Sequence, residues 1–190
     1  MDAIILSGPP AVGKTSVARF IAGRLPLKYV SGGDMLKELA KEEGYDVGGE
    51  EWWDTEEGQR FLRQRSNDYR YDLEVDKRLR KLAEKGGYVI TSYALPWLDA
   101  RGTRVWLKAS QPMRASRMSA RDGISVEAAL GVVKMRDEEN AQLYKKMYGY
   151  DFEKDLSVFD IMINTERITA AQVSGLVIRF AEMASKGPKN

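Results

Sequence analysis

The stretch Gly8-Pro9-Pro10-Ala11-Val12-Gly13-Lys14-Thr15 decides the fold of this chain. It follows the short apolar run Ala3-Ile4-Ile5-Leu6, which is typical of a buried β-strand. It precedes residues 15–25, in which apolar side chains recur at helical spacing until Pro26 ends the pattern. The stretch satisfies the pattern G-x-x-x-x-G-K-[ST] between a strand and a helix, where phosphate binding requires it. We therefore predict a phosphate-binding loop that leads directly into a helix.

Two side chains of this loop indicate the chemistry that it supports. The glycines let the backbone curl so that its N–H groups face a phosphate, and the helix N-terminus adds its dipole. Lys14 can reach the β- and γ-phosphates of a nucleotide, and the Thr15 hydroxyl can ligate Mg²⁺. A chance glycine-rich turn is the alternative, and the position between a strand and a helix argues against it.

The remainder of the chain alternates between strand-like and helix-like segments. The further predicted strands are residues 28–30, 88–91, 104–107 and 159–163. The further predicted helices are residues 34–43, 57–85, 112–121, 125–147 and one that begins at the capping-box sequence Thr169-Ala170-Ala171-Gln172. Strands separated by helices predict a parallel sheet with helices on both faces, a three-layer α/β/α arrangement. With 190 residues, of which 43% are hydrophobic, we expect a single domain over residues 1–190.

The composition excludes several classes of catalyst and partner. With no cysteine and no histidine, the chain has no thiolate nucleophile, no Ser-His-Asp triad and no imidazole metal ligand. Catalysis must then depend on Lys, Arg, carboxylates, hydroxyls, backbone N–H groups or Mg²⁺, which favours phosphate chemistry. The net charge of +2, from 30 basic and 28 acidic residues, argues against a nucleic-acid partner. Since no apolar run is long enough for a membrane span, we expect a soluble, cytoplasmic monomer.

A basic stretch supports the phosphate interpretation. From Arg101 to Arg121 the chain carries several basic residues and no acidic one. Arg114, Arg117 and Arg121 are spaced i, i+3 and i+7, so a helix places all three on one face. Guanidinium groups suit the charge that develops on a transferring phosphoryl group. An exposed basic helix face is the alternative, and the nearby phosphate loop favours the functional interpretation.

Further stretches of the chain resemble a known family. Besides the loop, residues Ser31 to Ala40 and Arg114 to Gly123 look like those of nucleoside monophosphate kinases. Three C-terminal stretches narrow the resemblance to cytidylate kinases of the archaeal type, namely Asp122 to Leu130, Tyr148 to Asp151 and Asp155 to Thr165. The resemblance covers most of the chain and is weakest over about residues 44–71.

This resemblance implies a fold, a reaction and a set of site residues. The implied fold is that of P-loop NTPases, a five-stranded parallel sheet with an acceptor-binding arm over about residues 31–86 and an arginine-bearing lid over about residues 112–147. The implied reaction is ATP + CMP to ADP + CDP with Mg²⁺, with dCMP as a second acceptor. The implied ATP contacts are Gly8, Pro9, Pro10, Ala11, Val12, Gly13, Lys14, Thr15 and Ser16. The other implied site residues are the acceptor-binding Asp34 and Lys37 and the phosphate-binding Arg117 and Arg121 of the lid. Arg136 and Asp137 of the next helix complete the implied site. Arg114 is either a phosphate contact or part of the helix surface.

The chain departs from the family pattern on the acceptor side. Lys37 stands where relatives usually have arginine, so a point charge replaces a bidentate group. Thr91-Ser92-Tyr93 replaces a turn that carries charged residues in many relatives, and Asn140 and Leu143 stand where some cytidylate kinases have acidic and basic side chains. The acceptor therefore stays open between CMP and AMP, UMP, dTMP or a small hydroxylated metabolite. A non-catalytic nucleotide-binding module is the alternative from a different class.

The acidic segment around Trp52-Trp53 has two interpretations. Residues 42–57 carry acidic side chains and no basic one. The indoles could cap a base in the arm, or they could pack the arm against the body while the acids face solvent. We favour packing, and we favour it for Tyr144, Tyr148 and Tyr150 as well, since no basic stripe interleaves with these tyrosines.

Overall fold

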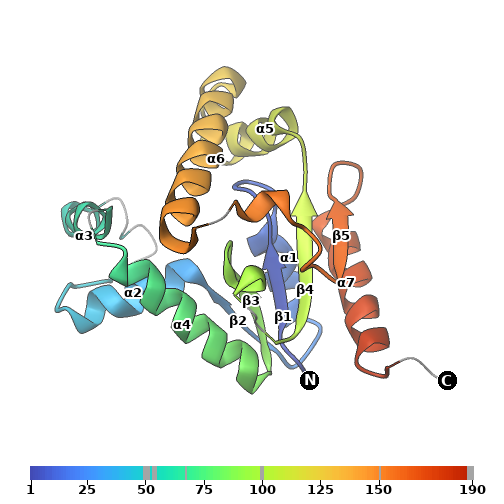
Figure 1. Cartoon of the computed structure of the whole chain (residues 1–190). Coiled ribbons are helices and arrows are strands. Elements are labelled where there is room, and N and C mark those ends of the chain that lie inside the picture. The colour runs from blue at the N-terminus through green and yellow to red at the C-terminus, as the bar shows by residue number, and fades with distance from the viewer. Residues whose placement is uncertain (49–51, 53–54, 67, 99–100, 150, 188–190) are drawn as a thin grey trace.

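The centre of the molecule is a five-stranded parallel sheet (Figure 1). The computed structural model describes residues 1–48, 52, 55–66, 68–98, 101–149 and 151–187. The strand order is β2-β3-β1-β4-β5. The strands are β1 Ile4–Ser7, β2 Lys28–Ser31, β3 Tyr88–Thr91, β4 Thr103–Lys108 and β5 Ile161–Asn164. Each predicted strand is confirmed, with ends that differ by one or two residues.

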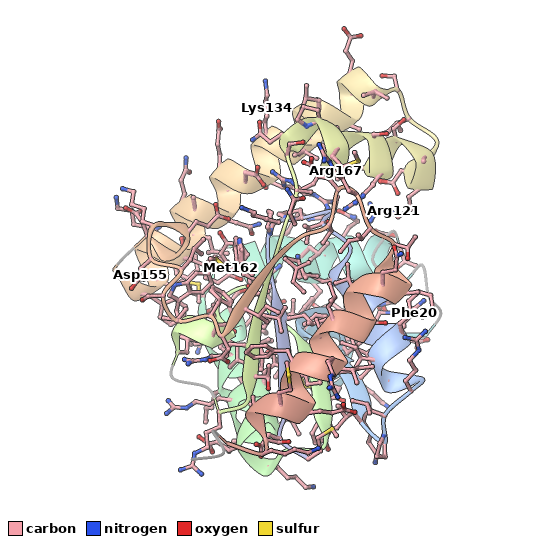
Figure 2. The ribbon with its side chains drawn as sticks, turned by 90° about the vertical axis from the view of Figure 1, so that its right-hand side faces the viewer. Phe20, Arg121, Lys134, Asp155, Met162 and Arg167 are labelled. Atoms are coloured by element: carbon pink, nitrogen blue, oxygen red, sulfur yellow. The ribbon has the colours of Figure 1, made fainter. Side chains whose placement is uncertain are left out.

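One face of the sheet is covered by two helices, α1 (Lys14–Ala22) and α7 (Ala170–Ala184). Side chains alternate along a strand, so Ile4 and Leu6 of β1 point to this same face. There they pack with Val177 in a core that is closed to solvent. Figure 2 shows α7 lying across the sheet on this side.

The opposite face of the sheet is covered by α2 (Gly32–Glu42) and α4 (Arg70–Lys85). Ile5, the residue between the two that face α1, points to this second core and packs with Leu36 and Leu79. Both faces of the central strands are therefore buried, which explains their unbroken apolar sequences. The predicted three-layer α/β/α arrangement is confirmed.

Two further helices lie beyond the carboxyl ends of the strands and pack against each other (Figure 1). They are α5 (Gln111–Asp122) and α6 (Val126–Tyr148), and they share a small core of their own around Met118 and Val133. Two short 3₁₀ turns, η2 Leu95–Trp97 and η3 Phe152–Lys154, complete the described helical segments. None of the helices in the described part of the chain is both long and apolar enough to cross a membrane.

The predicted continuous helix over residues 57–85 is wrong. The structure divides it into α3 (Glu56–Ser66) and α4 (Arg70–Lys85). Asp68 lies in the break, where its carboxylate accepts a hydrogen bond from the backbone N–H of Arg70 at 3.0 Å. Short acidic side chains compete in this way with the hydrogen bonds of a continuing helix. The break lets α3 turn away from α4 and form a separate part of the arm (Figure 1).

Trp52 is buried, as the packing interpretation predicts, but its described ring contacts lie within the arm rather than between the arm and the body. Its side chain is 2% exposed and packs against Phe61 of α3 with ring centroids 5.9 Å apart. Tyr45 and Tyr71 contact the same Phe61 ring at 5.4 and 5.1 Å. These aromatic rings join α3 to α2 and α4. Trp53 and Tyr150 lie outside the described residues.

Candidate active site

The phosphate-binding loop follows β1 and has a conformation that few sequences can adopt. Gly8 has a φ of 140°, and a Cβ at this position would lie 2.2 Å from the carbonyl oxygen of Leu107 in β4. Ala11 and Gly13 also have positive φ angles, of 59° and 103°. Gly13 is the N-cap of α1 and has no side chain to cap the helix. The N–H groups of the first helical turn are therefore available to an anion.

Lys14 folds back over this loop. Its Nζ atom donates hydrogen bonds to the carbonyl oxygens of Gly8 at 2.6 Å and Pro9 at 2.9 Å. Burial and the nearby positive charge of Arg114 lower the pKa of Lys14 to about 8. Its hydrogen bonds to described residues go to neutral carbonyls, so this buried ammonium group is well placed to gain from a bound polyanion.

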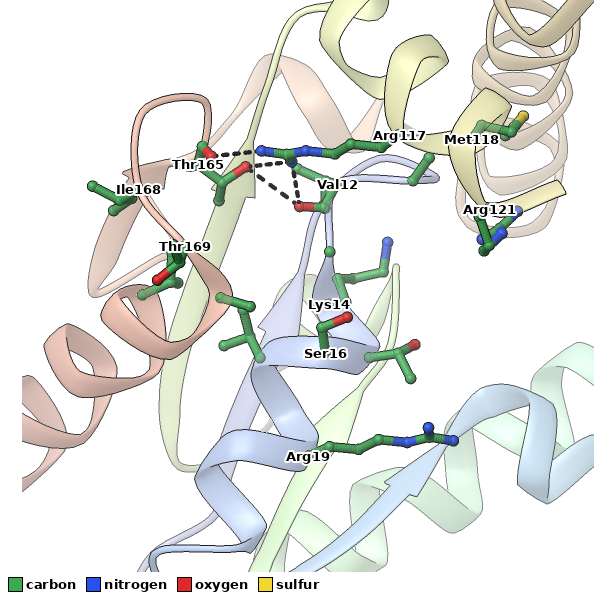
Figure 3. A pocket seen from close by; sticks show the side chains of 16 residues that line it. Val12, Lys14, Ser16, Arg19, Arg117, Met118, Arg121, Thr165, Ile168 and Thr169 are labelled. Carbon is green, nitrogen blue, oxygen red and sulfur yellow. Dashed lines mark hydrogen bonds between the residues drawn. The ribbon is translucent and has the colours of Figure 1, made fainter. Parts of the chain in front are cut away.

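A cavity of about 690 Å³ opens above the loop and the start of α1 (Figure 3). Its walls come from the loop, α1, α5 and the start of α7. Arg117 extends from α5 across the loop and donates hydrogen bonds to the Val12 carbonyl at 3.1 Å and to the Thr165 carbonyl at 2.6 Å. Arg121 lies one turn further along α5, at another edge of the cavity. The volume and these two arginines suit a nucleoside triphosphate.

The sequence predicts that Arg114 either contacts a phosphate or lies on the helix surface. In the structure it is buried, and it is not among the residues that line the cavity above the loop. It is 4% exposed and lies behind the loop, where Nη1 donates to the Pro10 carbonyl at 3.2 Å. It forms a bidentate pair with Asp137 of α6, at 2.9 and 2.7 Å. Burial alone would raise the pKa of Asp137, but hydrogen bonds from Arg114 and Gln111 hold it below its usual value. Asp137 lies on a different helix and gives Arg114 a partly buried partner, which the spacing of the arginines along α5 does not reveal.

A second cavity, of about 260 Å³, meets the first one at Lys14, whose side chain lines both. We call it the acceptor cavity, because several of its residues belong to the arm over about residues 31–86 that the sequence predicts to bind an acceptor. It lies between the ends of β2 and β3 and the helices α2, α3, α4 and α6. Its apolar wall includes Leu36, Val75 and Leu79. Tyr93 and Tyr144 form another wall, with ring centroids 4.7 Å apart and planes nearly parallel.

Three charged residues that sequence reasoning missed line this acceptor cavity, namely Arg65, Asp72 and Asp76. Asp72 accepts two hydrogen bonds from Arg65, from Nε at 3.1 Å and from Nη2 at 2.5 Å. Asp76 accepts one from the Tyr148 hydroxyl at 2.5 Å, and burial raises its pKa to about 6. The i, i+4 spacing of the two aspartates around Val75 on a predicted helix was a signal that could have found them.

A third cavity, of about 510 Å³, shares Arg65 and Asp72 with the acceptor cavity. Asn140 and Leu143 of α6 line it. Of the positions at which the sequence departs from the family pattern, Asn140 and Leu143 thus line the third cavity, and Thr91, Ser92 and Tyr93 line the neighbouring acceptor cavity.

Comparison with known proteins agrees with this geometry. The family model described as the cytidylate kinase-like family matches residues 3–167. The chain belongs to the cytidylate kinase-like family. It is 30% identical over 177 residues to a cytidylate kinase of Sulfurisphaera tokodaii, covering 92% of each chain. It is 34% identical over 167 residues to a cytidylate kinase of Ignicoccus hospitalis, covering 87% of this chain and 90% of the relative.

Solved structures place this cytidylate kinase-like protein in the P-loop kinase fold. Shikimate kinase from Acinetobacter baumannii superimposes with a TM-score of 0.59 at 18% sequence identity, covering 100% of this chain and 96% of that one. This likeness concerns the fold alone. Family membership makes the protein a P-loop phosphotransferase. We call the cavity above the loop the donor cavity, after the ATP contacts that the sequence predicts there.

Three further predicted residues of this cytidylate kinase-like enzyme, Asp34, Lys37 and Arg136, are not among the residues that line the two cavities. Asp34 is exposed and closes a capping box, since its carboxylate accepts from the backbone N–H and hydroxyl of Ser31 at 2.8 and 2.7 Å. Lys37 lies half-buried one turn later on α2. Arg136 is exposed on α6, where its charge, after that of Arg121, helps to lower the pKa of Asp122.

Proposed function

We propose that the protein transfers the γ-phosphoryl group of ATP to CMP, and also to dCMP, releasing ADP and the nucleoside diphosphate. The observation that carries this proposal is the position of Lys14, whose side chain lines both the donor cavity and the acceptor cavity. A phosphoryl group that passes from one nucleotide to the other would stay beside this ammonium group throughout. The names of the relatives support CMP as the acceptor.

The donor triphosphate is held by groups of the loop and by cations around it. The N–H groups at the start of α1 bind phosphate oxygens, and Lys14 exchanges its two carbonyl partners for the β- and γ-phosphates. Arg117, Arg121 and Arg136 stabilise the charge that spreads over the transferring group. Asp137 acts through Arg114, which supports the loop from behind at Pro10. Asp34 keeps the start of α2 in place for Lys37, which contacts the acceptor phosphate.

The reaction needs no strong base in this protein. An oxygen of the acceptor phosphate is already anionic, so it can form the new bond to the γ-phosphorus while the bond to the β-phosphate oxygen breaks. The protein then has to align two polyanions and exclude water, which suits a chain without histidine. Closure of α5 and α6 over the donor cavity supplies this exclusion.

The residues of the donor cavity fit a magnesium ion. The Thr15 side chain lines this cavity at the first turn of α1, directly after Lys14. Mg²⁺ usually takes one or two protein oxygens and fills its other positions with phosphate oxygens and water. When bound, the ion would neutralise charge on the β- and γ-phosphates, and Thr15 would hold it.

The test is coupled ADP release from Mg-ATP with CMP, dCMP, UMP, AMP, GMP and dTMP as acceptors. We expect turnover with CMP and dCMP, and a loss of about 10³-fold or more in Lys14→Ala. Lys134→Ala is the matched control, because Lys134 is an exposed lysine on α6 (Figure 2). Unchanged turnover in Lys14→Ala would refute the proposal. ATP binding without ADP release under any acceptor would instead favour a non-catalytic module.

A further inference from the structure

Two carboxylates of α4, those of Asp72 and Asp76, line the acceptor cavity together with Arg65 and Lys14. Asp72 and Asp76 are both 8% exposed, so each is nearly removed from solvent. The positive charge of Arg65 offsets that of Asp72, with which it forms a bidentate pair. Asp76 forms no ion pair among the described residues, although the charge of Arg65 acts on it from a greater distance. A phosphate group cannot lie against Asp76 without strong repulsion, so the acceptor phosphate belongs at the Lys14 end.

The acceptor base then lies against Asp76, where one oxygen atom is open to it. The Oδ2 atom of Asp76 accepts the hydrogen bond from Tyr148. The Oδ1 atom has no hydrogen-bond partner among the described residues, and Asp76 is one of the residues that line the cavity. Arg65 likewise has its Nε and Nη2 atoms bound to Asp72, while Nη1 has no partner among the described residues.

These two open atoms have opposite hydrogen-bonding character. A carboxylate oxygen only accepts hydrogen bonds, and a guanidinium nitrogen only donates them. Cytosine presents an amino donor at C4 beside two acceptors, N3 and O2. Uracil and thymine present a carbonyl oxygen at C4, which would face the Asp76 carboxylate with no proton between them. Burial makes this mismatch costly, since neither group could turn to water.

We infer that Asp76 is a specificity-determining residue, which selects acceptor nucleotides whose base carries an exocyclic amino group and rejects UMP and dTMP. This inference rests on the proposed function, because it takes the acceptor to be a nucleoside monophosphate. Arg65 completes the recognition by donating to the base nitrogen or oxygen beside the amino group. Val75 and Leu36 pack against the faces of the base. The turn Thr91-Ser92-Tyr93 carries no charged side chain, so the charged groups that select the base come from Arg65 of α3 and Asp76 of α4.

The experiment compares kcat/KM for CMP and UMP in the full-length enzyme and in Asp76→Asn. We expect the wild type to prefer CMP by about 10²-fold or more, because a site built for a donor leaves its own groups unpaired with an acceptor. An amide can present either its oxygen or its nitrogen to the base. The CMP-to-UMP ratio in Asp76→Asn is therefore expected to fall at least about tenfold. An unchanged ratio would overturn the inference.

Glu84→Gln is the matched control, because it removes an exposed carboxylate from the same helix. We expect its CMP-to-UMP ratio to equal that of the wild type. Calorimetric binding of CMP and UMP in the absence of ATP separates this inference from the proposed function. The wild type could fail to release ADP and still bind CMP in preference to UMP. If Asp76→Asn then loses that binding preference, only the proposed function is refuted. Equal binding of CMP and UMP by the wild type refutes the inference.

Discussion

The donor cavity and the acceptor cavity meet at Lys14, yet they are built in opposite ways. The donor cavity depends on backbone groups of one short loop, with Gly8 at a position where no other side chain fits. The acceptor cavity depends on side chains from four helices and two strand ends, including Asp76 and Tyr144. Four cationic side chains line the donor cavity, those of Lys14, Arg19, Arg117 and Arg121, whereas two carboxylates, those of Asp72 and Asp76, line the acceptor cavity. A triphosphate is recognised by charge and shape, whereas a base is recognised by where its donors and acceptors lie.

This difference predicts that a substitution that disrupts the donor cavity lowers the activity with every acceptor nucleotide by the same factor. Removing Asp137 leaves Arg114 buried without its partner behind the loop. We expect Asp137→Ala to lower the free energy of unfolding by about 3–5 kcal/mol, because an uncompensated buried charge is costly. Thermal denaturation measures the loss, and kcat/KM for ATP is expected to fall by the same factor with CMP as with AMP. A normal melting temperature would show that the pair does not support the loop.

The pH dependence of ATP binding is expected to follow Lys14. Its pKa is about 8 in the free protein, and a bound polyanion raises it, so ATP binds best to the protonated form. Affinity is therefore constant well below pH 8 and is lost as the pH rises through this value, by about tenfold for each further pH unit. Calorimetry in buffers of different ionisation enthalpy would detect the accompanying proton uptake. Affinity that does not change between pH 7 and 10 would contradict this prediction.

On the acceptor side, the same substitution that alters selectivity is expected to stabilise the protein. The pKa of Asp76 is raised to about 6, so the folded state favours the protonated group. The penalty for the buried charge is absent below the unfolded pKa of about 4 and grows as the pH rises to 6. Asp76→Asn keeps an acceptor for Tyr148 and removes the charge. We expect it to raise the free energy of unfolding by about 1–2 kcal/mol at pH 8 and by little at pH 4. Urea denaturation at the two pH values measures the difference, and equal effects at both would contradict the assignment.

The smallest expected effect provides a control outside both cavities. Gly131 lies exposed on α6, and a Cβ at this position would have open space around it. Gly131→Ala is expected to stabilise the protein by about 0.5–1 kcal/mol, because alanine loses less backbone freedom in a helix. Its kinetics with CMP and UMP are expected to match the wild type. A changed CMP-to-UMP ratio in this variant would show that selectivity responds to α6 in general rather than to Asp76.

Local sequence signals predicted the fold and the donor side of the site. The strand, loop and first helix follow directly from the apolar run and the glycines around Lys14, and the capping box at Thr169 starts α7 as expected. The acceptor side could not be predicted in the same way. Asp76 acquires its environment from Tyr148, a residue 72 positions away. Arg114 is buried by Asp137, 23 positions away. The break at Asp68 was missed because the helical pattern continues on both sides of it.

Helix α6 has a consequence for how the two nucleotides influence each other. It holds Arg114 behind the phosphate loop through Asp137, and it holds Asp76 in the acceptor cavity through Tyr148. These two contacts are about 17 Å apart along one uninterrupted helix, at about 1.5 Å per residue. If α6 shifts when a nucleotide fills one cavity, it also moves the residues that line or support the other cavity. The binding free energies of ATP and the acceptor are thus expected to be coupled. If ATP changes the dissociation constant of the acceptor by some factor, the acceptor must change that of ATP by the same factor.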